Sequence, residues 1–191
     1  AVKDKVKSWW AKNVTPIPTS GAMHGPGKPG GITLVNYKGS NFINSATIAS
    51  DFRDSAETIN RYAKSNNVNI EIISSGVRQK GAPIPGDVYH KPGEVTESSP
   101  HYVAHAIDFN VEYLNSNGAK ALCSKSCLDI GVGNNIKSLP NGVSGFIQNV
   151  NDDPGLRWGG NFSRPDSIHI DDGIYQNSSQ SYSLLFNLFQ K

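Results

Sequence analysis

The sequence has few cysteines, little net charge and no long apolar run. Its 191 residues include 2 Cys and 1 Met, and 18 Lys and Arg against 16 Asp and Glu give a formal net charge of +2 at pH 7. This near balance argues against a nucleic-acid-binding surface, which needs a basic stripe stronger than the modest cluster at Lys3, Lys5 and Lys7. No run of about 18 apolar residues occurs, so we expect no membrane span.

The two cysteines, Cys123 and Cys127, are only four residues apart. This spacing fits either a local disulfide, which would suit an oxidising compartment, or two free thiols. A structural zinc site at these residues is disfavoured, because no second Cys or His pair lies nearby.

The composition indicates a folded domain with an appendage. Hydrophobic residues make up 37% of the chain and charged residues 18%, which is too little charge for a disordered protein. Residues 15–31 are rich in proline and glycine, as in a loop or linker. We therefore divide the chain into an N-terminal segment and linker at 1–45 and one domain at 46–191. Trp9 and Trp10, in the first segment, are interpreted as docking on that domain.

The periodicity of apolar residues predicts both strands and helices. Strands are expected at Ile32–Tyr37, Ile70–Ser75, Ala104–Val111 and Ser167–Asp171, and helices at Thr47–Asn66, Ala119–Leu128, Val143–Val150 and Tyr182–Phe189. These elements predict an α+β domain. We expect a small, mostly antiparallel sheet that carries the candidate site, with the helices packed on its other face.

The segment Ser99–Asp108 contains two candidate metal ligands. If residues 104–111 form a strand, Asp108 shares its face with two alanine methyl groups, which leave room for an ion and a substrate. His101 lies just before the strand, where a bend can bring its imidazole to the same ion. His105 would point to the opposite face, and we interpret it as a core or interface histidine.

A third ligand and a base follow in Trp158–Asp171. His169 completes a set of two nitrogens and one carboxylate, which leaves the fourth position of a zinc ion for water. Asp166 lies three residues earlier, so one turn of chain can direct both groups at one point. A carboxylate there can take a proton from a water whose pKa zinc lowers to about 7. His90 is the main rival ligand, but it lacks a motif neighbour and is interpreted as a surface or cleft-rim residue.

Together these pieces resemble the M15 zinc metallopeptidases, which include D-alanyl-D-alanine carboxypeptidases, dipeptidases and L-alanyl-D-glutamate endopeptidases of cell-wall lysis. The family pattern S-x-H-x-x-G-x-A-x-D, then W-G-G and D-x-x-H, is matched at Ser99, His101, Ala106, Asp108, Trp158, Gly159, Gly160, Asp166 and His169. Two positions depart from it. Ala104 replaces the usual glycine, which is costly if the backbone there has a positive φ. Aspartate instead of glutamate at 166 favours the endopeptidase branch.

The resemblance implies a role for each matched residue. One zinc ion per chain would be held by His101, Asp108 and His169, with Asp166 as the general base. Ser75–Arg78 resembles the family's S-G-x-R segment, which implies that Arg78 stabilises the substrate oxygen as it becomes negative. Ser99 would contact the substrate, and Trp158 would support the metal site from beneath. Asp171 alternates with His169 and either supports that ligand or is an exposed acid.

The implied substrate is the stem peptide of peptidoglycan, cut by an endopeptidase of the L-alanyl-D-glutamate type. A D-alanyl-D-alanine carboxypeptidase is the alternative within the family. An alternative of another class is a zinc-bearing module without catalysis that binds the wall or serves in phage or secretion assembly. We expect a monomer that acts at the bacterial cell wall, periplasmic or extracellular, of phage-encoded or secreted origin.

Overall fold

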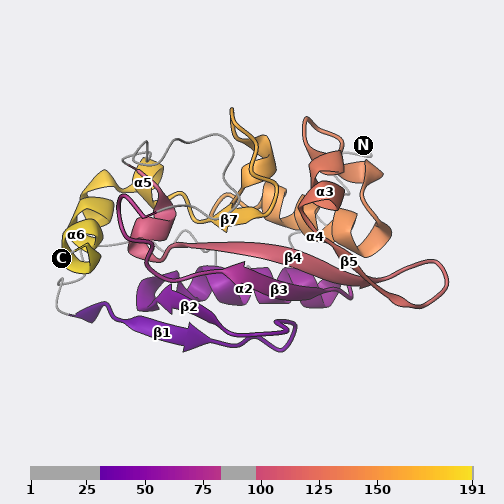
Figure 1. Cartoon of the computed structure of the whole chain (residues 1–191), viewed down its shortest axis with the longest axis horizontal. Coiled ribbons are helices and arrows are strands. Elements are labelled where there is room, and N and C mark those ends of the chain that lie inside the picture. Colours follow the sequence, from indigo (N-terminus) through magenta and orange to yellow (C-terminus); the bar gives the residue numbers. More distant parts are fainter. Residues whose placement is uncertain (1–30, 83–97, 191) are drawn as a thin grey trace, which may run out of the picture.

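The computed structural model describes residues 31–82 and 98–190. Within these ranges the chain is an α+β protein with a two-stranded and a five-stranded antiparallel sheet and five α-helices, as predicted (Figure 1). None of the helices in the described ranges is both long and apolar enough to cross a membrane. The interpretations of Trp9, Trp10 and His90 lie outside the described residues.

The elements follow in this order. The first half contains β1 (Leu34–Tyr37), β2 (Ala46–Ala49), the 3-10 helix η2 (Ser50–Phe52), α2 (Arg53–Ser65) and β3 (Asn69–Ser74). Then come η3 (Pro100–Val103), β4 (Ala106–Leu114), β5 (Lys120–Cys123), α3 (Lys125–Leu128), η4 (Asp129–Gly131), η5 (Ile136–Ser138) and α4 (Asn141–Asp152). The last part contains β6 (Arg157–Trp158), η6 (Gly159–Asn161), β7 (His169–Asp171), α5 (Ile174–Asn177) and α6 (Ser179–Phe189).

The larger sheet is built around β4, the long central strand in Figure 1. On one edge β4 pairs with β3, and on the other it pairs first with β7 and then with β5. In this register Asp108 lies opposite Ser74 on β3 and opposite His169 on β7. The sheet itself therefore brings two of the predicted ligands together.

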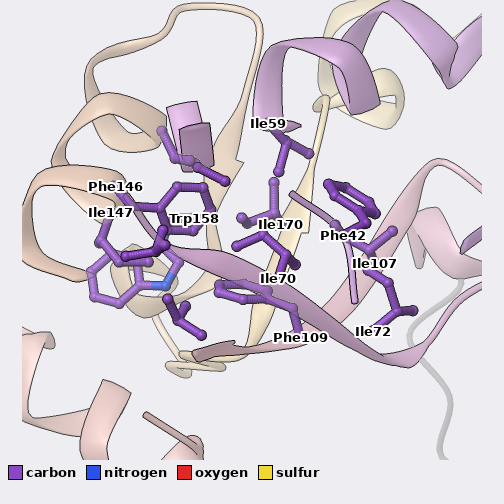
Figure 2. Close-up of a cluster of buried hydrophobic side chains, with 14 of the residues drawn as sticks. Phe42, Ile59, Ile70, Ile72, Ile107, Phe109, Phe146, Ile147, Trp158 and Ile170 are labelled. Carbon is purple, nitrogen blue, oxygen red and sulfur yellow. The ribbon is translucent and has the colours of Figure 1, made fainter. Parts of the chain in front are cut away.

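The hydrophobic core lies on one face of this sheet. Ile107 and Phe109 of β4 are fully buried, and they belong to the same apolar cluster as Ile59 of α2 and Phe146 of α4 (Figure 2). Since side chains alternate along a strand, Asp108 points away from this cluster. The helices α2 and α4 thus cover the face opposite to the one that carries Asp108, as predicted.

The predicted helix at Thr47–Asn66 is wrong in its first residues. Ala46–Ala49 is the strand β2, paired with β1, and the α-helix begins only at Arg53. The apolar residues Ile48 and Phe52 are four apart and therefore fit the helical period, although both are buried in the core. The pairing of β2 with β1 overrides this local pattern.

The predicted helix at Ala119–Leu128 is also only partly correct. Its first half is β5, which returns along β4 after a turn at residues 115–118, and only Lys125–Leu128 is helical. Cys123 ends β5 and forms a disulfide with Cys127 in α3. The local disulfide, one of the two states that the spacing allowed, therefore joins the strand to the helix.

Ala104 is not part of the predicted strand. It follows η3 in the left-handed conformation, with φ 57° and ψ 34°, and β4 begins only at Ala106. A left-handed residue other than glycine costs about 1–2 kcal/mol. The departure from the family's glycine thus falls at a position where the backbone has a positive φ.

Residues 34–45, placed by the predicted division in the N-terminal segment, pack on the domain. β1 pairs with β2, and Tyr37 and Phe42 are buried in the main core. The backbone of Ile43 donates to the carbonyl of Ile70 at 2.8 Å. This part of the chain is thus linked to β3 of the larger sheet through an isolated bridge between Phe42 and Ile70.

Candidate metal centre

Three elements bring the predicted ligands together. Asp108 lies on β4 and His169 on β7, at directly paired positions. His101 lies in η3, whose chain turns back through Ala104, so that the amide of His105 donates to the carbonyl of Pro100 at 3.1 Å. This turn is the bend that was expected to bring His101 to the strand.

The three ligand atoms form a nearly equilateral triangle. His101 Nε2 lies 3.0 Å from Asp108 Oδ1 and 3.1 Å from His169 Nδ1, and His169 Nδ1 lies 3.2 Å from the same carboxylate oxygen. Zinc–ligand bonds of about 2.0–2.1 Å in a tetrahedron place neighbouring ligand atoms about 3.3–3.4 Å apart. The residues therefore fit a zinc ion after shifts of a few tenths of an ångström, and this group could hold a metal ion.

The electrostatics of the cluster favour a cation. Burial lowers the pKa of His101, which keeps the imidazole neutral, as a metal ligand must be. Burial alone would raise the pKa of Asp108, but His101 and His169 outweigh it and hold this pKa far below its usual range. Burial would lower the pKa of His169, but its hydrogen bonds with Asp108 and Asp171 outweigh burial and raise it to about 9. In the metal-free protein a proton on His169 is thus stabilised between two carboxylates, and a metal ion that binds through Nδ1 has to displace it.

Asp171 supports a ligand and is not an exposed acid. It is fully buried, and its Oδ2 lies 2.8 Å from His169 Nε2, the ring nitrogen that faces away from the triangle. Arg157 and the backbone of Gly173 also donate to this carboxylate. The first of the two predicted alternatives for Asp171 is therefore confirmed.

Asp166 lies beside the triangle in a half-buried position. Burial raises its pKa, and the carboxyl group also interacts electrostatically with His169, Asp108 and His101. Its backbone is fixed on both sides: its amide donates to the carbonyl of Gly159 at 2.9 Å, and its carbonyl accepts from the amide of His169 at 3.0 Å. A Cβ at residue 159 would come within 2.2 Å of the Asp166 carbonyl oxygen, so glycine is required there.

Arg78 reaches the site through the other oxygen of Asp108. Its Nη2 donates to Asp108 Oδ2 at 3.2 Å, and its amide donates to the carbonyl of His101 at 2.9 Å. The guanidinium therefore occupies Oδ2 and leaves Oδ1 directed at the two imidazoles. Its role toward the substrate oxygen stays a prediction.

Ser99 and Trp158 lie at the edges of the site. Ser99 precedes η3, and its carbonyl accepts from the hydroxyl of Tyr182 at 3.1 Å; its contact with a substrate stays a prediction. Trp158 is buried in the core and donates through Nε1 to the carbonyl of Ser167 at 2.8 Å. Trp158 thus holds the chain between Asp166 and His169 from the core side.

A second buried cluster surrounds His105, which is fully buried. Its Nδ1 lies 2.7 Å from Asp172 Oδ2 and its Nε2 lies 3.0 Å from Asp51 Oδ1. Burial lowers the pKa of His105, but the hydrogen bonds with Asp172 and Asp51 outweigh it and raise the pKa to about 9. His105 is therefore a core histidine, one of the two interpretations made from the sequence, but its partner Asp51 is remote along the chain and has no local signal.

We expect the His105→Gln variant to be less stable than the natural protein, and more so in acid. A histidine with a pKa raised from about 6.5 to about 9 stabilises the fold fully below about pH 6.5 and loses this contribution as the pH rises through 9. The gap in unfolding free energy should therefore shrink by on the order of 3 kcal/mol between about pH 6 and pH 9.5. Urea unfolding of both metal-free proteins at each pH measures it. An equal gap at both ends would show that the pKa of His105 is the same in the folded and unfolded protein, and would contradict this prediction.

Comparison with known protein families finds none that matches this chain, and comparison with curated proteins finds no match either. The resemblance to the M15 family therefore depends on the motif residues, and what it implies about activity is argued below as a proposal.

Proposed function

We propose that the protein is a zinc-dependent peptidase that hydrolyses peptide bonds in peptidoglycan stem peptides, as an endopeptidase of the L-alanyl-D-glutamate type. The observation that carries this proposal is the convergence of His101, Asp108 and His169 on one point, with Asp166 beside them. A purely structural zinc site is usually closed by a fourth protein ligand, whereas three ligands with an adjacent acid are typical of catalytic zinc sites.

Each residue of the site has a role in this reaction. When bound, zinc would supply Lewis-acid chemistry, lowering the pKa of a water and polarising the scissile carbonyl. Asp166 would take the proton of the attacking water and pass it to the leaving amine, and its burial raises its pKa toward the range useful for a base. Arg78 has five N–H donors, of which the contact with Asp108 uses one, so others can serve the developing oxyanion.

The proposed place of action is the bacterial cell wall, outside the cytoplasm. The disulfide between Cys123 and Cys127 supports an oxidising compartment, because such bonds are rare where thiols are kept reduced. The assignment to the endopeptidase branch is supported by the aspartate at 166. Delivery to the wall by a phage or by secretion is part of the same proposal.

Digestion of purified peptidoglycan with the zinc-loaded protein tests this function. Mass spectrometry should find fragments with new L-alanine carboxyl ends and D-glutamate amino ends. Chelation should abolish their release, and added zinc should restore it. Release of terminal D-alanine alone would replace the endopeptidase with a carboxypeptidase. Full activity in the chelator, or no new termini from a zinc-loaded protein, would contradict the proposal.

A further inference from the structure

Arg157 lies outside the three-ligand cluster, yet the sheet connects it to His169. The pairing of β6 with β7 places Arg157 directly opposite Asp171. Its Nε and Nη2 donate to the two oxygens of Asp171 at 2.6 and 2.7 Å, and Asp171 Oδ2 lies 2.8 Å from His169 Nε2. One guanidinium thus fixes both oxygens of the carboxylate that holds the ligand.

Phe162 adds a second contact between the same residues. The guanidinium carbon of Arg157 lies 4.9 Å from the centre of the Phe162 ring, and that ring lies 5.6 Å from the His169 ring. A cation over an aromatic face at this distance is attracted to it. Each of four side chains therefore contacts the next in a closed ring around one ligand: His169, Asp171, Arg157 and Phe162.

The chemistry of the imidazole gives this arrangement a purpose. A histidine that binds a metal through Nδ1 must keep its remaining proton on Nε2. Asp171 is the acceptor for that proton, and a carboxylate gripped at both oxygens cannot rotate away from the ring. Residues that support a ligand in this way typically change metal affinity by 10–100-fold when they are replaced.

We propose that Arg157 is a positioning residue for the metal centre: through Asp171 it holds His169 with Nε2 protonated and Nδ1 directed at Asp108 and His101. This inference depends on the metal centre of the proposed function, but not on the peptidase reaction. Arg157 is suited to substitution, because its side chain is 32% exposed and borders a pocket of about 250 Å³.

Zinc affinity measured by competition with a coloured chelator tests the proposal. Arg157→Gln should bind zinc about 10–100-fold more weakly than the natural protein. Arg157→Lys should fall between the two, because an ammonium cannot grip both oxygens as the guanidinium fork does. Arg164→Gln is the matched control. Arg164 lies between η6 and β7 and is exposed, so its replacement should leave the zinc affinity unchanged.

A second readout separates positioning from a general loss of structure. Thermal melting of the metal-free variants reports whether they fold, and the visible spectrum of the cobalt-loaded protein should change in Arg157→Gln and be restored in part in Arg157→Lys. If Arg157→Gln fails to fold, the ring nitrogens of zinc-loaded natural protein decide the matter by NMR, since a His169 protonated on Nδ1 refutes the proposal.

The outcomes also separate this inference from the proposed function. If folded Arg157→Gln binds zinc as tightly as the unsubstituted protein, the positioning role is overturned, whether or not peptidoglycan is hydrolysed. A natural protein that binds zinc but leaves peptidoglycan uncut contradicts the peptidase and leaves the affinity comparison valid. If the unsubstituted protein binds no zinc, both the positioning role and the proposed peptidase function are overturned.

Discussion

Replacement of Asp166 by asparagine should remove peptidoglycan hydrolysis and leave the metal in place. The amide has the same shape but cannot accept a proton, and general-base catalysis typically contributes about 10²–10⁴-fold to the rate. Asp166 lies beside the ligand triangle and is not part of it, so its replacement should change the zinc affinity by less than about threefold. This is smaller than the tenfold change that corresponds to about 1.4 kcal/mol. The rate of fragment release and a zinc titration measure the two effects.

Asp54→Asn is the control for this experiment. Asp54 is an exposed acid in the first turn of α2, away from the site, so the same chemical change there should alter neither quantity. Unchanged turnover in Asp166→Asn would remove Asp166 as the base. A joint loss of turnover and zinc would instead make Asp166 part of the metal site.

Replacement of Asp108 by asparagine is expected to remove the metal itself. Asp108 Oδ1 faces both imidazoles and Oδ2 accepts from Arg78, so its negative charge lies between the guanidinium and the two ring nitrogens. The neutral amide would leave the Arg78 guanidinium without this carboxylate partner and would be a poor zinc ligand. We expect a loss of affinity well beyond the 10–100-fold typical of supporting residues, with hydrolysis lost in parallel.

Glu112→Gln provides a matched comparison on the same face of β4. Glu112 pairs with Asn69 and with the exposed Lys120, and surface pairs of this kind contribute about 0–1 kcal/mol. Metal content after dialysis, measured on both variants and the natural protein, should show one zinc per chain in all but Asp108→Asn. Retention of zinc by Asp108→Asn at natural affinity would exclude the proposed site.

The convergence of His101, Asp108 and His169 could be predicted because each belongs to a short local pattern, as does Asp166. His101 and Asp108 lie seven residues apart and Asp166 and His169 three apart, so local geometry limits where each pair can point. Arg157 and Asp171 meet only through the pairing of β6 with β7, and Asp51 reaches His105 across the fold. Contacts that depend on strand register or on distant packing have no local signal.

The fold was predicted where periodicity and burial agree, as in α2 beyond Arg53 and in β4. It was missed where a short strand imitates a helix. Residues 46–49 carry small and apolar side chains that fit either structure, and only the partner strand β1 decides between them. The positive φ of Ala104 could be named as a risk from the sequence, but its actual conformation depends on the turn that joins η3 to β4.

The double pairing of β4 at Asp108 has one more consequence. Because a neighbour is hydrogen-bonded on each edge there, a slip of one residue would turn the carboxylate into the apolar interior, and the sheet resists it. Strand register, and not the ion, thus sets the positions of Asp108 and His169. A zinc finger folds only around its metal and loses chain entropy when it binds. This protein should bind zinc without such folding, so little conformational entropy should be lost and the affinity should be correspondingly higher.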